Sequence, residues 1–251
     1  MGLEAMVDTV LCGDAIEVMK SLPDESVSCI VTSPPYNIGL DYGICRDLIP
    51  HDEFVEFQES WLGEAYRVSE DTARMYVIVS ENMLFWFRNS AEARGWRWGQ
   101  LLSWCKPNPV QTRRISGDWN YMTEYILLFR KGKRTPMDSS GDSHTFNWFI
   151  VATPQSNFTE KREHPAQLPI LLCKMLLART PGGLVLDPFC GSGSVLIAAR
   201  TLRKHWLGID LNPDYCEMAR RRIAEVPEAL PFEPTKNVDP VSQETMLEED
   251  E

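Results

Sequence analysis

A glycine-rich turn between Asp187 and Gly193 carries the sharpest chemical pattern in the sequence. An apolar run at residues 184–186 precedes the carboxylate of Asp187, and another apolar stretch follows the glycines. We expect a strand that ends at Asp187 and a helix that begins after Gly193. Glycine lets the backbone approach a ligand closely at such a turn, and the start of a helix offers free N–H groups. A further apolar run, residues 206–209, ends at another carboxylate, Asp210.

These two carboxylates suit a ligand that carries an amino group and a ribose. Asp210 can accept hydrogen bonds from both hydroxyls of a ribose, and Asp187 suits the amino group of a methionine moiety. A phosphate fits less well, because Asp187 would repel it and because the turn has neither a complete GxGxxG pattern nor a lysine after its glycines. For the isolated motif, a tight strand–helix turn that Asp187 caps is the structural alternative.

A second turn, Ser33-Pro34-Pro35-Tyr36, follows the apolar run at residues 29–32. The exocyclic amine of a nucleobase is a poor nucleophile because its lone pair is delocalised into the ring. Acceptors that draw on its N–H groups restore the lone pair, and the Ser33 hydroxyl and the Pro34 carbonyl are candidates on a loop that two prolines keep rigid. Tyr36 offers a flat face on which an extruded base could stack. The alternative is a Pro-Pro turn with an aromatic side chain packed nearby.

Strands and helices alternate along the chain, which predicts an α/β fold with a doubly wound, mostly parallel sheet. The expected strands are residues 7–12, 29–32, 74–80, 96–104, 123–129, 184–186 and 206–209. The expected helices are residues 15–22, 52–68, 81–94, 165–180, 195–202 and 215–226. Both chemical turns then lie at carboxyl ends of strands, where ligands of open α/β sheets bind.

The composition indicates a globular protein of the cytoplasm. No run approaches the roughly 18 consecutive apolar residues of a membrane span, and the N-terminus has no signal-peptide pattern. The seven cysteines are scattered and include no CxxC pair. We therefore expect reduced cysteines and no metal site.

The net charge of −11 at pH 7 weighs against a nucleic-acid partner, because phosphate contacts need Lys and Arg. However, residues 227–251 hold eight acidic residues and one basic residue, which leaves a net charge of −4 for residues 1–226. We expect residues 1–226 to form one domain, on which a basic patch can exist, and residues 227–251 to form an acidic, disordered tail.

Taken together, Ser33–Tyr36 and the turn from Asp187 to Gly193 resemble the motifs of the amino-methyltransferases of DNA, which make N4-methylcytosine or N6-methyladenine. The catalytic motif precedes the cofactor motif, as in the β group of that family, and the resemblance covers residues 10–226. It implies a Rossmann-like S-adenosylmethionine-dependent methyltransferase fold with a seven-stranded sheet in circularly permuted order. It also implies S-adenosyl-L-methionine as cofactor, double-stranded DNA as partner and a base flipped out of the helix.

The same resemblance implies a set of cofactor-binding residues. They are Asp14, His164, Gln167, Asp187, Pro188, Phe189, Gly191, Ser192, Gly193 and Asp210. The permuted order leads the helix at residues 215–226 back toward the strand at 7–12, which makes Asp14 the third acid at the edge of the sheet. The resemblance implies that its side chain or the neighbouring backbone contacts the adenine of the cofactor. The alternative role of Asp14, capping the helix at residues 15–22, is compatible with that placement. His164 opens a segment that resembles the family's HPxQKP pattern, although Leu168 stands where lysine is often found.

Residues 130–163 occupy the place of the family's target-recognition region, with Phe146, Trp148 and Phe149 among them. The candidate DNA contacts are basic residues there and in the loop at 106–120, namely Lys106, Arg113, Arg114, Lys131, Lys133, Arg134, Lys161 and Arg162. Basic side chains can contact phosphates while aromatic ones pack or wedge. A solvated insertion with a small hydrophobic patch of its own is the alternative.

Ser33 before Pro-Pro-Tyr is more typical of the N4-cytosine enzymes than of the N6-adenine ones, so the favoured function is N4-cytosine methylation, with N6-adenine methylation as the alternative. An RNA methyltransferase and an inactive regulator that binds S-adenosylmethionine and DNA are less favoured. A C5-cytosine enzyme is disfavoured because the chain has no Pro-Cys dipeptide. The sequence leaves open a homodimer and a companion restriction endonuclease.

Overall fold

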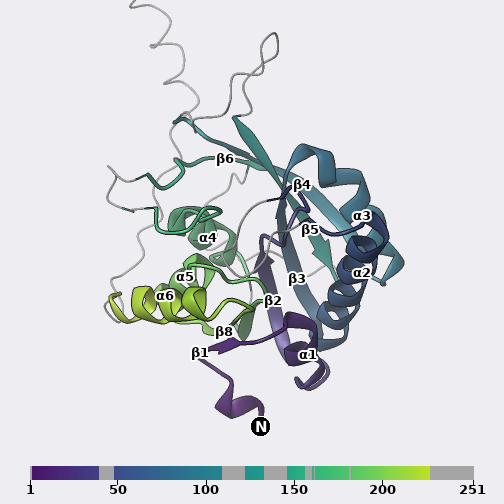
Figure 1. Ribbon diagram of the computed structural model, residues 1–251, viewed down its shortest axis with the longest axis horizontal. Coiled ribbons are helices and arrows are strands. Elements are labelled where there is room, and N and C mark those ends of the chain that lie inside the picture. Colours follow the sequence, from purple (N-terminus) through teal and green to yellow (C-terminus); the bar gives the residue numbers. More distant parts are fainter. Residues whose placement is uncertain are drawn as a thin grey trace, which may run out of the picture.

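The computed structural model describes residues 2–39, 48–108, 122–132, 146–155, 160, 162–180 and 182–226. In this part of the chain, eight strands form one sheet in the order β1-β8-β7-β2-β3-β5-β4-β6 (Figure 1). The strands are β1 (Thr9–Cys12), β2 (Val27–Thr32), β3 (Ser69–Val79), β4 (Arg97–Cys105), β5 (Thr123–Arg130), β6 (Trp148–Ile150), β7 (Leu184–Asp187) and β8 (His205–Asp210). Among these strands, β5 alone runs against its neighbours, so the expected mostly parallel α/β sheet is confirmed.

Helices cover both faces of the sheet, which gives three layers (Figure 1). One face carries α1 (Ala15–Lys20), α2 (His51–Val68) and α3 (Leu84–Ala93), and the other carries α4 (Ile170–Leu177), α5 (Ser194–Thr201) and α6 (Pro213–Ala224). Short 3₁₀ turns occur at Leu3–Ala5 and Glu81–Met83. Every residue of β2 is buried, as a central strand covered on both faces requires.

The start of the chain completes the sheet beside its last strand. β1 pairs in parallel with β8, and the Gly13 N–H donates to the Asp210 carbonyl at 2.9 Å. The Arg220 guanidinium of α6 donates to the Val10 carbonyl at 2.7 Å. The helix near the C-terminus therefore leads back to the first strand, which confirms the expected permuted order.

Two details differ from the expectations. The sheet has eight strands rather than seven, because the three-residue β6 pairs in parallel with β4; a strand this short has too little alternation to be recognised in a sequence. The helix expected to start at residue 165 starts at Ile170. Proline disfavours the α conformation in the residue before it, so Pro169 keeps Leu168 out of the helix.

No helix among the described residues is both long and apolar enough to cross a membrane. Residues 109–121 and 227–251 lie outside the described residues. The domain boundary at residue 226 and the disorder of the tail therefore stay predictions.

Candidate active site

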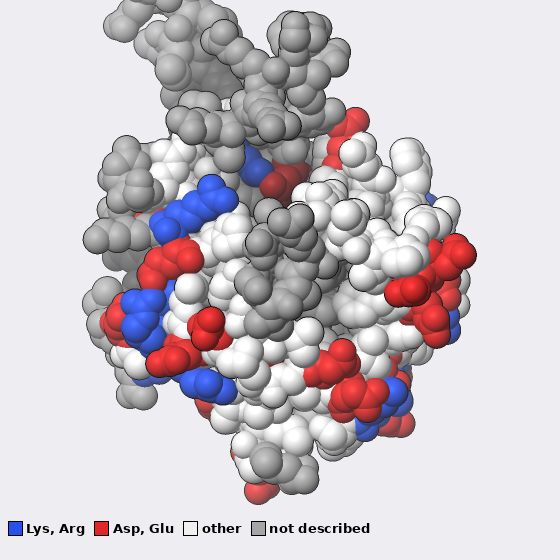
Figure 2. Space-filling view, in the orientation of Figure 1, with Lys and Arg blue, Asp and Glu red and all other residues white. Residues whose placement is uncertain are grey.

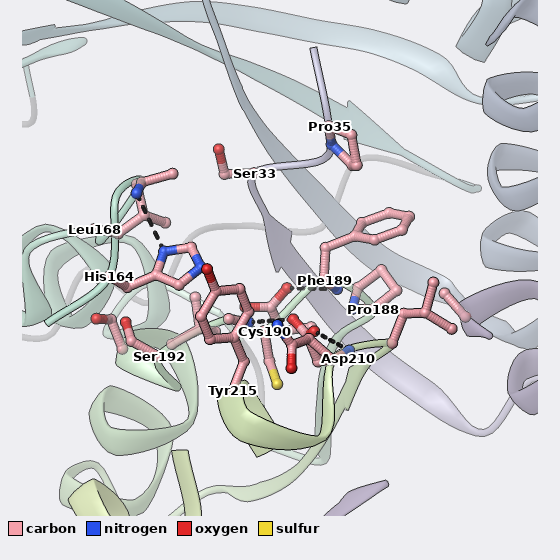
Figure 3. A pocket seen from close by; sticks show the side chains of 18 of the residues that line it. Ser33, Pro35, His164, Leu168, Pro188, Phe189, Cys190, Ser192, Asp210 and Tyr215 are labelled. Carbon is pink, nitrogen blue, oxygen red and sulfur yellow. Dashed lines mark hydrogen bonds between the residues drawn. The ribbon is translucent and has the colours of Figure 1, made fainter. Parts of the chain in front are cut away.

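A cavity of about 300 Å³ opens at the carboxyl ends of the parallel strands (Figure 3). Four neighbouring strands each bring one of the predicted polar residues to its wall. Asp14 comes after β1, Ser33 after β2, Asp187 at the end of β7 and Asp210 at the end of β8. The two chemical turns, far apart in the sequence, thus share one cavity.

Most of the predicted site residues line this cavity. Of the residues predicted to bind the cofactor, those that line it are Asp14, His164, Asp187, Pro188, Phe189, Gly191, Ser192 and Asp210, and of the residues predicted to be catalytic, Ser33 and Pro35 do so. Figure 3 shows Ser33 and Pro35 above the turn that contains Pro188 and Phe189. The lining of the cavity, as the described residues define it, does not include Gln167, Gly193, Pro34 or Tyr36.

The glycine turn needs glycine at two positions. Gly191 and Gly193 have φ values of +48° and +78°, in the left-handed region that other residues rarely adopt. A Cβ atom on Gly191 would lie 3.2 Å from the His164 ring, and one on Gly193 would lie 3.0 Å from the Ala219 Cβ. The turn can therefore pack tightly between the cavity and α6.

Asp210 ties this turn to the end of β8. Its Oδ2 accepts from the Gly191 N–H at 2.8 Å, and its Oδ1 accepts from the Asn212 N–H at 2.8 Å. Burial raises the pKa of Asp210 above its ordinary value. Each carboxylate oxygen has a second lone pair, so Asp210 can hold the turn and still accept from a ligand.

Asp187 is a deeply buried carboxyl. Its Oδ1 accepts from the Thr32 hydroxyl at 2.8 Å and from the Phe189 N–H at 3.2 Å. Burial, with a smaller contribution from the charge of Asp210, raises the pKa of Asp187 to about 7. A cation bound beside it would favour the ionised form, so the site is suited to a positively charged amino group.

His164 forms part of the cavity wall as a neutral side chain. Burial and the nearby Arg162 and Arg222 charges lower its pKa to about 4. Its Nδ1 accepts from the Ala166 N–H at 3.1 Å, so the proton of the neutral ring lies on Nε2. The ring packs edge-on against Tyr215, with 4.3 Å between the ring centroids (Figure 3).

Gln167 holds this segment in place. Its Oε1 accepts from the Glu163 N–H at 2.8 Å, and its Nε2 donates to Glu160 at 3.2 Å. These bonds hold Gln167 against Glu160 and Glu163, and its predicted contact with the cofactor stays a prediction.

Arg222 of α6 lies outside the motifs that predict the site, yet it links three parts of the site. Its buried guanidinium donates to the Ser192 carbonyl at 2.5 Å and lies 3.5 Å from Glu160. The sequence signal for Arg222 is its position on the apolar face of the helix, beside Ala219 and Ile223.

The Ser33–Tyr36 turn contains a directed pair of hydroxyls. The Tyr36 Oη donates to the Ile78 carbonyl at 2.8 Å and lies 2.9 Å from the Ser33 Oγ. Because the single Tyr36 proton faces a carbonyl, which can only accept, Ser33 must donate to Tyr36. The Ser33 oxygen can then contact a ligand as a hydrogen-bond acceptor, through its remaining lone pairs. The Tyr36 ring packs against the core on the α1–α3 side, and base stacking by this ring stays a prediction.

The described DNA-contact candidates lie at different edges of the sheet. Lys106 follows β4 at the carboxyl edge, pairs with Glu124 and lies 4.8 Å from the centre of the Trp104 ring. Arg162 donates to the His164 and Pro165 carbonyls beside the cavity. Lys131 lies at the amino ends of the strands, where it donates to the Ser69 carbonyl at 2.7 Å, away from the cavity.

The other basic candidates lie outside the described residues, and they are Arg113, Arg114, Lys133, Arg134 and Lys161. On the face shown in Figure 2, acidic and basic side chains intermix, and the described residues form no continuous basic surface there. Of the described candidates, Lys106 lies at the carboxyl edge of the sheet and Arg162 lies next to His164 of the cavity wall, and contact of either with DNA stays a prediction.

Comparisons with known proteins agree with this geometry. A family model described as DNA methylase matches residues 27–221. The type II methyltransferase M.HpaI of Haemophilus parainfluenzae is 29% identical over 247 residues, which cover 87% of this chain and 74% of that protein. The family match begins at β2 and ends within α6, so it includes both chemical turns.

Two solved structures share the fold. The PvuII DNA methyltransferase, described as cytosine-N4-specific, has a TM-score of 0.72 at 19% identity and covers 87% of this chain and 88% of its own. The Thermus thermophilus protein TTHA0409, solved in complex with S-adenosyl-L-methionine, has a TM-score of 0.63 at 26% identity and covers 90% of this chain and 99% of its own.

Proposed function

This chain belongs to the DNA methylase family whose model matches it, and we propose that it transfers a methyl group from S-adenosyl-L-methionine to the exocyclic N4 of cytosine in double-stranded DNA. The observation that carries the proposal is that Ser33, Asp187 and Asp210 line one cavity. The cavity thus holds a hydroxyl that can accept from an amine, together with two carboxylates that can bind a nucleoside cofactor.

The residues around the cavity fit S-adenosyl-L-methionine, which supplies a methyl group on a positively charged sulfur. Asp187 would pair with the amino group of the methionine part, because a buried carboxylate needs a cationic partner. Asp210 would accept from the ribose hydroxyls. Asp14 caps α1 through its Oδ1 alone, at 2.9 and 3.0 Å, which leaves its Oδ2 to accept from the adenine amine. The relative TTHA0409 was solved with this cofactor.

The Ser33–Tyr36 turn supplies a hydrogen-bond acceptor, the Ser33 oxygen, whose orientation is fixed. The Ser33 proton is directed toward Tyr36, so the Ser33 oxygen can accept from an N–H of the target amine. Drawing on that N–H makes the nitrogen lone pair available for the methyl group. Such an acceptor is most effective when it is held in place before the reaction, and the bond from Tyr36 to the Ile78 carbonyl provides that restraint.

The choice of cytosine rests on Ser33. A hydroxyl before Pro-Pro-Tyr resembles the N4-cytosine enzymes, and the PvuII methyltransferase, which has the same fold, is described as cytosine-N4-specific. M.HpaI is a type II methyltransferase, and a companion endonuclease for the same DNA site is the partner that this class implies.

The test is methylation of mixed-sequence duplex DNA with labelled S-adenosyl-L-methionine, followed by mass spectrometry of the nucleosides. We expect N4-methylcytosine. N6-methyladenine would replace the cytosine assignment by the adenine alternative. Transfer to tRNA or rRNA but not to DNA would overturn the DNA substrate. Cofactor binding with no transfer to any nucleic acid would identify an inactive binding protein.

A further inference from the structure

Gln58 of α2 makes a buried contact with the Ser33–Tyr36 turn, the proposed catalytic loop. Its Nε2 donates to the Pro35 carbonyl at 3.0 Å, and its side chain is fully buried. The other buried residues of α2 are apolar, namely Phe54, Trp61, Leu62, Ala65 and Val68. Burying an amide without a partner is costly, so a glutamine at this place indicates a specific role for its hydrogen bonds.

The orientation of the Gln58 amide follows from its partners. The indole Nε1 of Trp61 can only donate, and it contacts the Gln58 Oε1. The amide nitrogen must then face the Pro35 carbonyl, which can only accept. Trp61 is itself fully buried and packs edge-on against Phe189 of the cofactor turn, with 5.4 Å between the ring centroids. The bonded pair Gln58 and Trp61 of α2 therefore links the two turns of the site.

The loop needs such a restraint because proline leaves the ψ angle of the backbone free to rotate. The pyrrolidine ring fixes φ but not ψ, so the peptide after Pro35 can still rotate. A bond to the Pro35 carbonyl fixes that rotation from outside the loop. The Tyr36 hydroxyl bonded to the Ile78 carbonyl fixes the next residue against β3. With Pro35 directed toward α2, the Pro34 carbonyl and the Ser33 hydroxyl are the loop acceptors that can face the target amine.

We propose that Gln58 is a positioning residue for methyl transfer: its amide holds the Pro35 carbonyl so that Ser33 and Pro34 present their oxygens to the amine that is methylated. This inference rests on the proposed function, because it requires the loop to contact the target base. It adds a residue of α2, outside both motifs, to the parts that determine turnover.

The first test replaces Gln58 by Met, which has a similar length and no donor. We expect Gln58→Met to lower kcat about tenfold, the factor that corresponds to losing one buried hydrogen bond, while the Kd for S-adenosyl-L-methionine stays within about twofold. Gln100→Met, the same change at an exposed position of β4, is the matched control. Trp96→Phe removes a different buried bond to α2, at the Leu62 carbonyl, and should lower the melting temperature without lowering kcat.

The second test, Gln58→Glu, gives a pH signature that a packing role would not produce. The neutral carboxyl has an O–H that can donate to the Pro35 carbonyl, whereas the ionised carboxylate can only accept and repels it. Burial raises the pKa of a carboxyl, so both forms should occur within the working range. We expect the ratio of the kcat of this variant to that of the wild type to be near one at pH 6 and to fall about tenfold by pH 8.5.

The outcomes separate this inference from the proposed function. If the wild type methylates DNA and both Gln58 variants match its kcat at every pH, the positioning role is wrong even where the melting temperature falls. If the wild type transfers no methyl group to DNA, the proposed function fails, and the inference fails with it. A kcat loss in Gln58→Met that equals the loss in Trp96→Phe would also overturn the positioning role.

Discussion

The Thr32 hydroxyl donates to the Asp187 carboxylate at 2.8 Å, and this bond joins the last residue of β2 to the last residue of β7. Both side chains are buried. Thr32 directly precedes the loop that carries Ser33, and Asp187 opens the glycine turn. The hydroxyl stabilises the ionised carboxyl, because a hydrogen bond to the charged form favours it.

The raised pKa of Asp187 predicts that cofactor affinity depends on pH. Burial raises this pKa to about 7 in the cofactor-free protein, whereas a cationic amino group needs the carboxylate. Affinity for S-adenosyl-L-methionine should therefore rise from pH 6 to pH 8, and binding near pH 6.5 should release a proton. Calorimetry in buffers of different ionisation enthalpy measures that proton. Binding without proton release below pH 7 would contradict the assignment.

The same pKa has a consequence for stability. The folded carboxyl keeps its proton up to about pH 7, whereas the unfolded one loses it near its ordinary value of about 4. The contribution to the free energy of unfolding is thus fully present below pH 4 and is lost as the pH rises through 7. In Asp187→Asn, denaturant unfolding should show a smaller decline between pH 4 and pH 7 than in the wild type.

Thr32→Val tests the bond between the two strands. Valine keeps the branched shape but removes the donor, so the pKa of Asp187 should rise further and cofactor affinity at pH 7 should weaken by about 1 kcal/mol, or roughly fivefold. Thr32→Ser keeps the hydroxyl and is the control. Equal affinity in the valine and serine variants at pH 7 would show that the bond has no part in binding.

The sequence was sufficient to predict that two carboxylates lie together at one edge of the sheet. Asp187 and Asp210 each follow a buried apolar run directly, and parallel strands bring their carboxyl ends to one edge of a sheet. Strand direction was harder to infer. Lys131, a predicted DNA contact, follows the end of β5, the reversed strand, and so lies at the opposite edge of the sheet.

The sequence could not predict the roles of buried polar residues on helices. Gln58 and Arg222 lie on apolar helix faces, where a sequence shows only an interruption of the pattern. Their partners, the Pro35 and Ser192 carbonyls, are backbone atoms of distant turns. Backbone acceptors carry no residue-type signal, so such bonds become visible only in three dimensions.

Asp210→Ala should weaken S-adenosyl-L-methionine binding by about 2 kcal/mol, since it removes the acceptor of the Gly191 N–H and the acceptors proposed for two ribose hydroxyls. Asp210→Asn keeps one acceptor oxygen and should lose less. Calorimetry of both variants, with circular dichroism to establish folding, measures the difference. Unchanged affinity in a folded Asp210→Ala protein would remove Asp210 from the cofactor site.

The last prediction concerns the hydroxyl pair of the catalytic loop. Tyr36→Phe keeps the ring but removes the acceptor toward which Ser33 donates. The Ser33 hydroxyl can then point its proton at the target amine instead of accepting a hydrogen bond from the N–H of that amine. The activation barrier of single-turnover methyl transfer should rise by about 1–2 kcal/mol. The cofactor Kd should stay unchanged, since the carboxylates proposed to bind the cofactor lie on other strands. Ser33→Ala should slow transfer by a similar amount.

Because both changes disable the same acceptor, their effects should not add. The double variant should be little slower than Ser33→Ala alone, which gives a coupling energy of about 1 kcal/mol in a double-mutant cycle. Tyr36→Ala removes the ring as well and should be slower than Tyr36→Phe if the ring also stacks on the flipped base. Fully additive effects would show that Tyr36 acts independently of Ser33, and a wild-type transfer rate in Tyr36→Ala would exclude this loop from catalysis.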